Sequence, residues 1–184
     1  MFLTNILWKK ELVKINGCYI FLTPLCMSSS FKSHFDYKYV FKVPPEAQII
    51  ILDRDPVDRF LSFYNKKVLG RELSLRKKIW YWLKFRNLNG SDSIDNVLMY
   101  LKDIPIELRD KHVLPISFFF NYYKKNNEVL VLDPFDKKGK ELLSAYLGDF
   151  PSVHKFSSLS RSNSRFNRNE LTSTQLEIIK ALFS

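Results

Sequence analysis

Glycine and cysteine are scarce in this sequence, and each scarcity argues against a class of protein. Only five glycines occur among 184 residues, and no G-x-x-x-x-G-K-[ST] segment is present. P-loop kinases grip phosphate with such a segment, so the sequence argues against kinase activity. The two cysteines, Cys18 and Cys26, fit neither a C-x-x-C redox pair nor a zinc-binding set. We expect two reduced thiols and no bound metal.

Long hydrophobic runs are also missing. The longest apolar stretch, residues 18–27, contains Thr23 and Pro24 and falls short of the roughly 20 residues that a membrane-spanning helix needs. In residues 1–14 the charged side chains follow the apolar ones, which is the reverse of a secretory signal. We therefore expect a cytoplasmic protein without a membrane span.

The composition favours one packed domain over residues 1–184. Hydrophobic residues make up 46% of the chain and aromatic residues 15%, which is enough for one sizeable core. The net charge of +10 attracts anions, such as nucleotides, nucleic acid, acidic glycans or anionic lipid head groups. Charge alone does not choose among these partners.

Predicted strands alternate with predicted helices along the chain. Residues 18–23 read as a strand, and Ser28, Ser29 and Ser30 follow as the cap of a helix. Residues 47–52 read as a buried strand, with Asp55 as N-cap, Pro56 as first helical residue and Gly70 as the stop. A third buried strand is predicted at 128–132, and further helices at 73–87, 94–104, 137–147 and 172–183. This alternation predicts an α/β fold whose mainly parallel central sheet is flanked by helices on both faces. Residues 151–169 read as a long basic, serine-rich loop.

Arg54 and Ser62 are candidates for holding a phosphate group. Arg54 follows a predicted buried strand and Ser62 lies two turns into the next helix. Ligands of parallel sheets bind beyond the carboxyl ends of the strands, where arginine and helix N–H groups can meet an anion. In the alternative interpretation, Arg54 pairs with a neighbouring aspartate and Ser62 only packs.

The segment from Leu52 to Tyr64 resembles the 3′-phosphate-binding segment of carbohydrate sulfotransferases. The family pattern is R-D-P-hydrophobic-x-R-hydrophobic-x-S-x-Y, and every fixed position is matched. The family transfers sulfonate from 3′-phosphoadenosine 5′-phosphosulfate (PAPS) to a sugar hydroxyl. The resemblance implies a P-loop-like sulfotransferase architecture, with Arg54 and Ser62 on the 3′-phosphate and Arg59 as a helix-packing or salt-bridge residue.

The segment from Cys18 to Phe31 resembles the family's 5′-phosphosulfate loop, P-K-x-x-x-[ST]-[ST]. Pro24 and the three serines Ser28, Ser29 and Ser30 match, but Leu25 takes the place of the lysine. In the family that lysine neutralises the bridging oxygen as sulfonate leaves, and electrostatic help of this kind is often the largest catalytic contribution. Lys32 is our candidate replacement. Otherwise the protein binds PAPS without turnover, or the serines are an ordinary helix cap.

The resemblance also suggests residues for the acceptor and for the outer phosphates. The segment from His112 to Pro115 resembles the family's H-x-x-P segment and implies His112 as the base that accepts a proton from the sugar hydroxyl. The alternative role of His112 is a loop hydrogen bond. Arg161 and Arg165 are candidate phosphate contacts, unless they are only solvated.

The expected partner is a carbohydrate, in particular an acidic polysaccharide or a glycolipid. Five basic residues of the predicted helix at 73–87 would face such an acceptor or a peripheral membrane surface: Arg76, Lys77, Lys78, Lys84 and Arg86. The main alternative is a basic nucleic-acid-binding module, because residues 71–86 mix basic and aromatic side chains. We regard nucleic acid as the less favoured partner.

Overall fold

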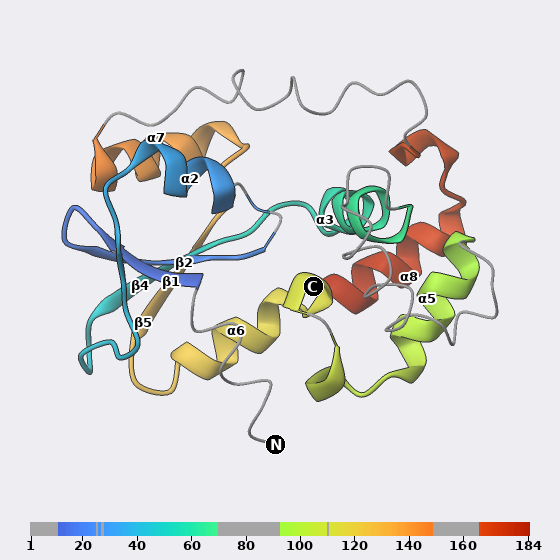
Figure 1. Cartoon of the computed structure of the whole chain (residues 1–184), viewed down its shortest axis with the longest axis horizontal. Helices are drawn as coiled ribbons and strands as arrows, with labels where there is room; N and C mark the ends of the chain where they lie inside the picture. The colour runs from blue at the N-terminus through green and yellow to red at the C-terminus, as the bar shows by residue number, and fades with distance from the viewer. Residues whose placement is uncertain (1–10, 25, 27, 70–92, 110, 149–165) are drawn as a thin grey trace. The chain divides into compact units, whose positions relative to one another are not determined.

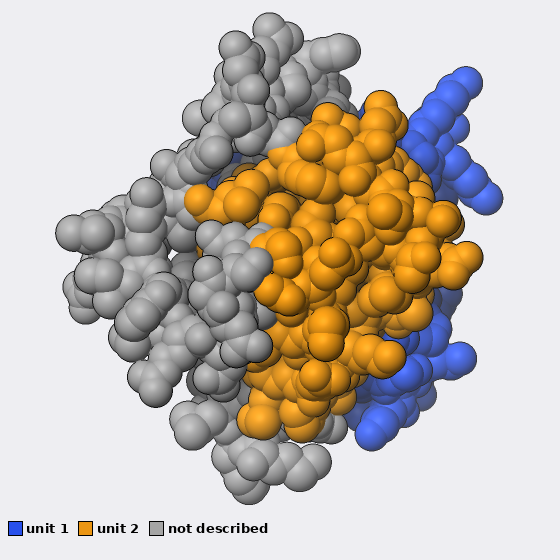
Figure 2. Space-filling model, turned by 90° about the vertical axis from the view of Figure 1, so that its right-hand side faces the viewer, with its two compact units in different colours: residues 1–55, 116–163 blue, residues 56–115, 164–184 orange. Residues whose placement is uncertain are grey.

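The computed structural model describes residues 11–24, 26, 28–69, 93–109, 111–148 and 166–184 (Figure 1). The chain divides into two compact units. The first comprises residues 1–55 and 116–163, and the second comprises residues 56–115 and 164–184 (Figure 2, blue and orange). The expectation that these units behave as one domain stays a prediction. The predicted basic helix at 73–87, together with Gly70, Arg161 and Arg165, lies outside the described residues.

The first unit is built on a five-stranded sheet with the strand order β3-β1-β2-β4-β5. Its strands are β1 (Leu12–Ile15), β2 (Cys18–Leu22), β3 (Lys38–Tyr39), β4 (Gln48–Leu52) and β5 (Glu128–Leu132). The three strands predicted from the sequence, β2, β4 and β5, are present and pair in parallel. However, β1 pairs antiparallel with both β2 and β3, so the sheet is mixed and the predicted mainly parallel sheet is not confirmed. The α/β class itself is confirmed.

A two-residue turn joins β1 to β2. Asn16 and Gly17 both have positive φ, at 47° and 87°, as a type I′ hairpin turn requires. The Asn16 side chain also donates a hydrogen bond of 2.8 Å to the carbonyl oxygen of Leu147. The hairpin was not predicted, although an Asn-Gly pair beside the alternating residues 12–15 is a strong hairpin signal.

Helices cover both faces of this sheet, as expected. On one face lie α2 (Ser28–His34) and α7 (Lys137–Leu147), and on the other lies α6 (Ile116–Tyr123), as Figure 1 shows. Successive strand residues point to opposite faces. Ile20 and Leu22 accordingly join the core under α2 and α7, whereas the Phe21 ring lies 4.6 Å, centroid to centroid, from Phe119 of α6.

The prediction that β5 is a buried strand is wrong. Among its five residues only Leu132 is buried, and Val131 is 40% exposed. The strand has the apolar sequence of an interior strand, but among the strands described here it is the last in the sheet and pairs only with β4. Helix α7 packs close to the end of β5: a Cβ atom added to Gly139 would overlap the backbone carbonyl of Asp133.

The second unit is helical in its described part. It contains α3 (Pro56–Phe63), α5 (Ile94–Asp103) and α8 (Ser173–Phe183), with a π-helical continuation of α3, η2 (Tyr64–Val68), and short 3-10 turns η3 (Ile106–Leu108), η4 (Lys111–Val113) and η7 (Arg168–Glu170). The predicted start at Pro56 is confirmed. Helix α5 buries Ile94, Val97, Leu98 and Leu101, and a capping box of Thr172 and Gln175 begins α8.

Arg59 holds α3 against α8. Its side chain is 1% exposed, its guanidinium carbon lies 5.3 Å from the centroid of the Phe183 ring, and it donates a hydrogen bond to the Phe183 carbonyl oxygen. The prediction that Arg59 is a helix-packing residue is confirmed.

The predicted loop 151–169 ends in a short 3-10 turn. Residues 149–165 lie outside the described part, but η7 begins at Arg168, and the Asn65 side chain binds both backbone groups of Phe166. The sequence contains an Asn167 and Glu170 capping box that marks this turn. In the part of the chain described here, none of the helices has the length and apolar character needed to cross a bilayer.

Candidate functional site

The carboxyl ends of β2, β4 and β5 meet at one edge of the sheet. The parallel register aligns Leu22 with Leu52 and Leu52 with Leu132, so the residues that follow these leucines emerge together. In open α/β sheets this edge is where ligands bind. We call it the carboxyl edge, and it consists of Thr23, Asp53, Arg54, Asp133 and Phe135.

Arg54 supplies positive charge to the carboxyl edge. The Asp53 N–H donates a hydrogen bond of 3.0 Å to the Leu132 carbonyl oxygen, which extends the β4–β5 pairing one residue beyond the strand. Arg54 comes next and is half-buried, with its guanidinium carbon 4.7 Å from the centroid of the Phe135 ring. Stacking on an aromatic ring restricts the guanidinium plane while leaving its edge able to donate hydrogen bonds. This arrangement suits a phosphate.

Asp133 places a carboxyl group beside that arginine. Its Oδ1 accepts a hydrogen bond of 2.7 Å from the Phe135 N–H. Burial raises the pKa of the Asp133 carboxyl above its ordinary value, and the nearby Asp136 carboxylate raises it too. Arg54 and the N–H groups of Phe135 and Asp136 oppose the shift. Burial therefore disfavours the ionised form of Asp133. An ionised Asp133 would also repel an anion bound at the carboxyl edge.

Thr23 contributes a buried hydroxyl that the sequence did not reveal as part of the site. Its side chain is 1% exposed, and its Oγ1 has no hydrogen-bond partner among the residues that the structure describes. Leaving a buried polar group unsatisfied costs about 1–3 kcal/mol, so such groups call for an explanation. A bound oxyanion at the carboxyl edge would provide an acceptor. A hydroxyl residue that ends an apolar strand immediately before a proline was the available signal.

The serines after this strand lie in the first turn of α2. The Thr23 carbonyl oxygen accepts a hydrogen bond of 3.0 Å from the Cys26 N–H, which closes a turn around the buried Pro24. Helix α2 begins at Ser28, which is half-buried, so the serines belong to the helix and do not precede it. The side chains of Ser29 and Ser30 and the whole of Leu25 lie outside the described part.

Lys32 is held by an ion pair. Its Nζ lies 2.8 Å from Oε2 of Glu11 and 5.5 Å from the centroid of the Tyr39 ring. The side chains of Lys32 and Glu11 are only 23% and 10% exposed, so solvent screens the pair weakly. Glu11 immediately precedes Leu12, which pairs with Phe21 near the carboxyl end of β2. Lys32 therefore lies near the carboxyl edge, but Glu11 neutralises its charge.

Two further candidates, Ser62 and His112, belong to the second unit. Ser62 is half-buried in α3, and His112 is half-buried in η4, which contacts α3. The structure thus groups Arg54, Thr23, Ser28 and Lys32 in the first unit, and Ser62 with His112 in the second. Across the described ranges, no group of three or more histidine, cysteine or acidic side chains is placed to hold a metal ion.

No protein-family model matches the chain, and no curated protein or solved structure shows significant similarity to it. The resemblance to carbohydrate sulfotransferases therefore rests on sequence segments alone, chiefly those around Pro24 and Arg54.

Proposed function

We propose that this protein binds PAPS at the carboxyl edge and transfers its sulfonate to a hydroxyl group of a carbohydrate. The observation that carries the proposal is the position of Arg54. It matches the arginine of the 3′-phosphate-binding pattern, it follows the interior strand β4, and it is stacked on Phe135 at the edge where parallel sheets bind ligands. The β2–α2 and β4–α3 segments each run from strand through turn to helix, and this order supports the proposal.

Different residues would hold the two phosphate-bearing ends of the nucleotide. Arg54 and Ser62 would bind the 3′-phosphate, and Arg161 and Arg165 would add outer contacts. The 5′-phosphosulfate would be held by Ser28, Ser29 and Ser30. The unsatisfied Thr23 hydroxyl fits this assignment, because it is a buried donor on the strand that leads to those serines.

In the transfer, the acceptor hydroxyl oxygen forms a bond to sulfur while the bond between sulfur and the bridging phosphate oxygen breaks, releasing adenosine 3′,5′-bisphosphate. His112 would accept the hydroxyl proton. Lys32 would have to exchange Glu11 for the bridging oxygen in order to replace the lysine that is missing at Leu25. The acceptor we propose is an acidic polysaccharide or a glycolipid, in keeping with the net charge of +10.

A second candidate function is PAPS binding without turnover. The ion pair of 2.8 Å between Lys32 and Glu11 favours it, because a lysine neutralised by a partly buried carboxylate offers less charge to a leaving group. Loss of transfer in Lys32→Ala with unchanged nucleotide affinity would support the enzyme. If the wild type transfers nothing and Leu25→Lys creates activity, the protein is a binder.

The binding claim is tested by comparing two nucleotides by calorimetry. Adenosine 3′,5′-bisphosphate and adenosine 5′-monophosphate differ only in the 3′-phosphate, and we expect the wild type to prefer the first. Arg54→Ala should weaken bisphosphate binding by about 1.5–3 kcal/mol and remove the preference, because charge-assisted contacts to phosphate are lost. Ser62→Ala should do less.

Arg168→Ala is the matched control for Arg54→Ala, because Arg168 is an exposed arginine in another part of the chain. It should retain the preference for the bisphosphate. Equal affinities of the wild type for both nucleotides would refute a 3′-phosphate site at Arg54.

A further inference from the structure

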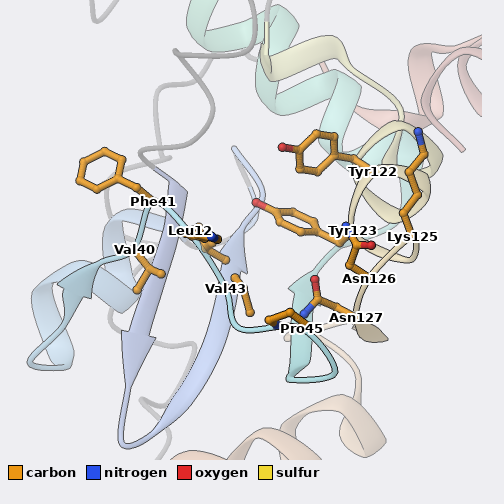
Figure 3. Close-up of a pocket in the computed structure, with 11 residues that line it drawn as sticks. Leu12, Val40, Phe41, Val43, Pro45, Tyr122, Tyr123, Lys125, Asn126 and Asn127 are labelled. Atoms are coloured by element: carbon orange, nitrogen blue, oxygen red, sulfur yellow. The ribbon is translucent and has the colours of Figure 1, made fainter.

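A cavity of about 470 Å³ lies in the first unit, and its lining includes none of the residues assigned to the nucleotide. One wall is the segment from Val40 to Pro45, which leads into β4, and the other runs from Tyr122 to Asn127, which leads into β5 (Figure 3). Leu12 completes the lining. The volume is in the range of natural small-molecule sites. Both walls precede their strands, whereas Arg54 and Asp133 follow them.

Hydrogen bonds fix the two walls to each other. The Asn127 side-chain amide donates hydrogen bonds of 2.8 Å to the Pro44 carbonyl oxygen and 3.1 Å to that of Ala47. The Glu46 N–H donates a hydrogen bond of 2.9 Å to the Asn126 carbonyl oxygen, with Glu46 at a φ of 65°. A non-glycine residue keeps such a φ only where its surroundings hold it. The cavity is therefore formed before any ligand arrives.

Aromatic rings line the cavity and its mouth. Tyr123 is buried and reaches from α6 toward Leu12, and burial raises the pKa of its hydroxyl, which therefore stays protonated at neutral pH (Figure 3). At the mouth, Phe41 is 73% and Tyr122 is 44% exposed. Exposed aromatic side chains at a pocket typically pack against the apolar face of a ring in the ligand.

The charged side chains among the described lining residues are all basic. They are Lys42 and Lys125, and none of the described lining residues is aspartate or glutamate. Glu46 is next to the lining residue Pro45, but its side chain is exposed and not part of the lining. Two lysines without a compensating carboxylate favour an anion. A lysine ammonium is a compact point charge, unlike the arginine fork that reads phosphate bidentately.

We propose that this cavity binds an acidic sugar unit. The rings of Phe41, Tyr122 and Tyr123 would pack on the apolar face of the sugar, and Lys42 and Lys125 would surround its carboxylate or sulfate. A nucleotide fits less well, because the Asn127 amide is already bound to backbone carbonyls and does not read a base edge. That the bound sugar belongs to the acceptor glycan rests on the proposed function, whereas the binding itself does not.

The test uses the full chain and two tetrasaccharides, one of hyaluronan, which carries carboxylates, and one of chitin, which is neutral. We expect the hyaluronan tetrasaccharide to bind more tightly by about ten-fold or more, since the two lysines of the lining attract its charges. The Lys42→Gln/Lys125→Gln variant should lose that difference. Tyr122→Ala should weaken the binding of both sugars. The control variant Lys137→Gln/Lys138→Gln, altered at exposed lysines of α7, should behave as the wild type.

Three outcomes would overturn the inference. Equal affinities of the wild type for the two sugars would remove the acidic preference, and retained hyaluronan affinity in the double lysine variant would place the site elsewhere. Weakened binding of adenosine 3′,5′-bisphosphate in that variant would make the cavity a nucleotide site. Sugar binding in a protein that does not bind the bisphosphate would leave the cavity standing and refute the sulfotransferase proposal. Binding of the bisphosphate without binding of either sugar would refute only the proposed sugar site in the cavity.

Discussion

Two arginines of one motif, five positions apart, have different roles in this structure. Arg54 is half-buried at the carboxyl edge, where its guanidinium stacks on Phe135. Arg59 is fully buried and binds the carbonyl oxygen of Phe183, the last residue of α8. A cation is favourable at a helix C-terminus, where carbonyl groups lack partners. In this motif Arg59 supports the packing of α3 on α8, whereas Arg54 is the residue that we propose binds the ligand.

Arg59→Ala should destabilise the protein strongly. The change removes a buried hydrogen-bonded cation and its stacking on Phe183, and we expect the free energy of unfolding to fall by about 3 kcal/mol or more. Urea denaturation measures the loss. The control Arg168→Ala removes an exposed pair of 3.9 Å with Asp58 and should cost less than about 1 kcal/mol. Unchanged stability with lost bisphosphate affinity would move Arg59 into the binding site.

Asp133→Asn should stabilise the protein at neutral pH and strengthen bisphosphate binding. Because burial raises the pKa of the folded carboxyl above its unfolded value, its stabilising contribution is complete below the unfolded pKa. That contribution is lost as the pH rises through the folded pKa. An asparagine oxygen still accepts from Phe135, but carries no charge beside Arg54.

Urea denaturation of the wild type and Asp133→Asn should therefore show a stability difference at pH 7 that vanishes in acid. The control Asp36→Asn changes an exposed carboxyl after α2. It should show neither the stability difference at pH 7 nor stronger binding of the bisphosphate. A pH-independent difference for Asp133→Asn would exclude linkage to this carboxyl.

At the scale of elements, sequence patterns located those with strong local signals. β2, β4 and the helices α3, α5, α7 and α8 follow from apolar periodicity, caps and proline or glycine boundaries. β3 is two exposed residues and has no sequence signal. Helix α6 is rich in phenylalanine and tyrosine, which favour strands, and it is buried through Phe119 and Tyr123, one turn apart. Tertiary packing, which the sequence pattern does not reveal, decides its conformation.

The same limit applies to the candidate site. Arg54 could be placed by its motif because the strand before it and the helix after it are both locally encoded. The pairing of Lys32 with Glu11 could not, because the two residues are 21 positions apart and are brought together by the β1–β2 hairpin, which was not predicted. Long-range pairing of strands brings those residues together, and periodicity along one segment carries no information about it.

Gly139→Ala should destabilise the contact of α7 with β5. Gly139 lies in the first turn of α7, where its N–H donates a hydrogen bond of 2.6 Å to Asp136, and an added Cβ would overlap the Asp133 carbonyl. Backbone atoms cannot move aside cheaply, so we expect a loss of about 2 kcal/mol or more in the free energy of unfolding. Ser144→Ala, at an exposed position of the same helix, should be neutral or slightly stabilising. Equal stabilities of the two variants would contradict the close approach.

At the scale of the whole molecule, positive charge and discontinuous units are the main features. Each unit is assembled from two separate stretches of chain, and β5, α6 and α7 return to the sheet only after the second unit has begun. The net charge of +10 acts on every anion, so affinity alone does not separate a nucleotide site from a nucleic-acid surface. The dependence of the binding affinity on salt concentration separates the two.

Binding of adenosine 3′,5′-bisphosphate should be saturable and only moderately salt-dependent, because few phosphate charges are involved. Binding of a single-stranded DNA 20-mer should be weaker at physiological salt and should fall steeply, with a slope of about −0.7 per contacted phosphate in a plot of log affinity against log salt. Fluorescence anisotropy between 50 and about 300 mM salt measures both. Tight DNA binding at the upper concentration without bisphosphate binding would favour the nucleic-acid alternative.

The parallel pairing of β4 with β5 has a consequence for synthesis of the chain. Residues 49–52 of β4 are all buried, yet the β5 residues that pair with them are about 80 positions later in the sequence. At about 5–20 residues per second, roughly 4 to 16 s pass on the ribosome before the second neighbour of β4 exists. The β1–β2 hairpin can close at once, but the β5 side of an Ile-Ile-Ile-Leu strand stays open for that time. During that time the unpaired side of this strand exposes the nascent chain to aggregation, and a chaperone that binds extended apolar segments would protect it.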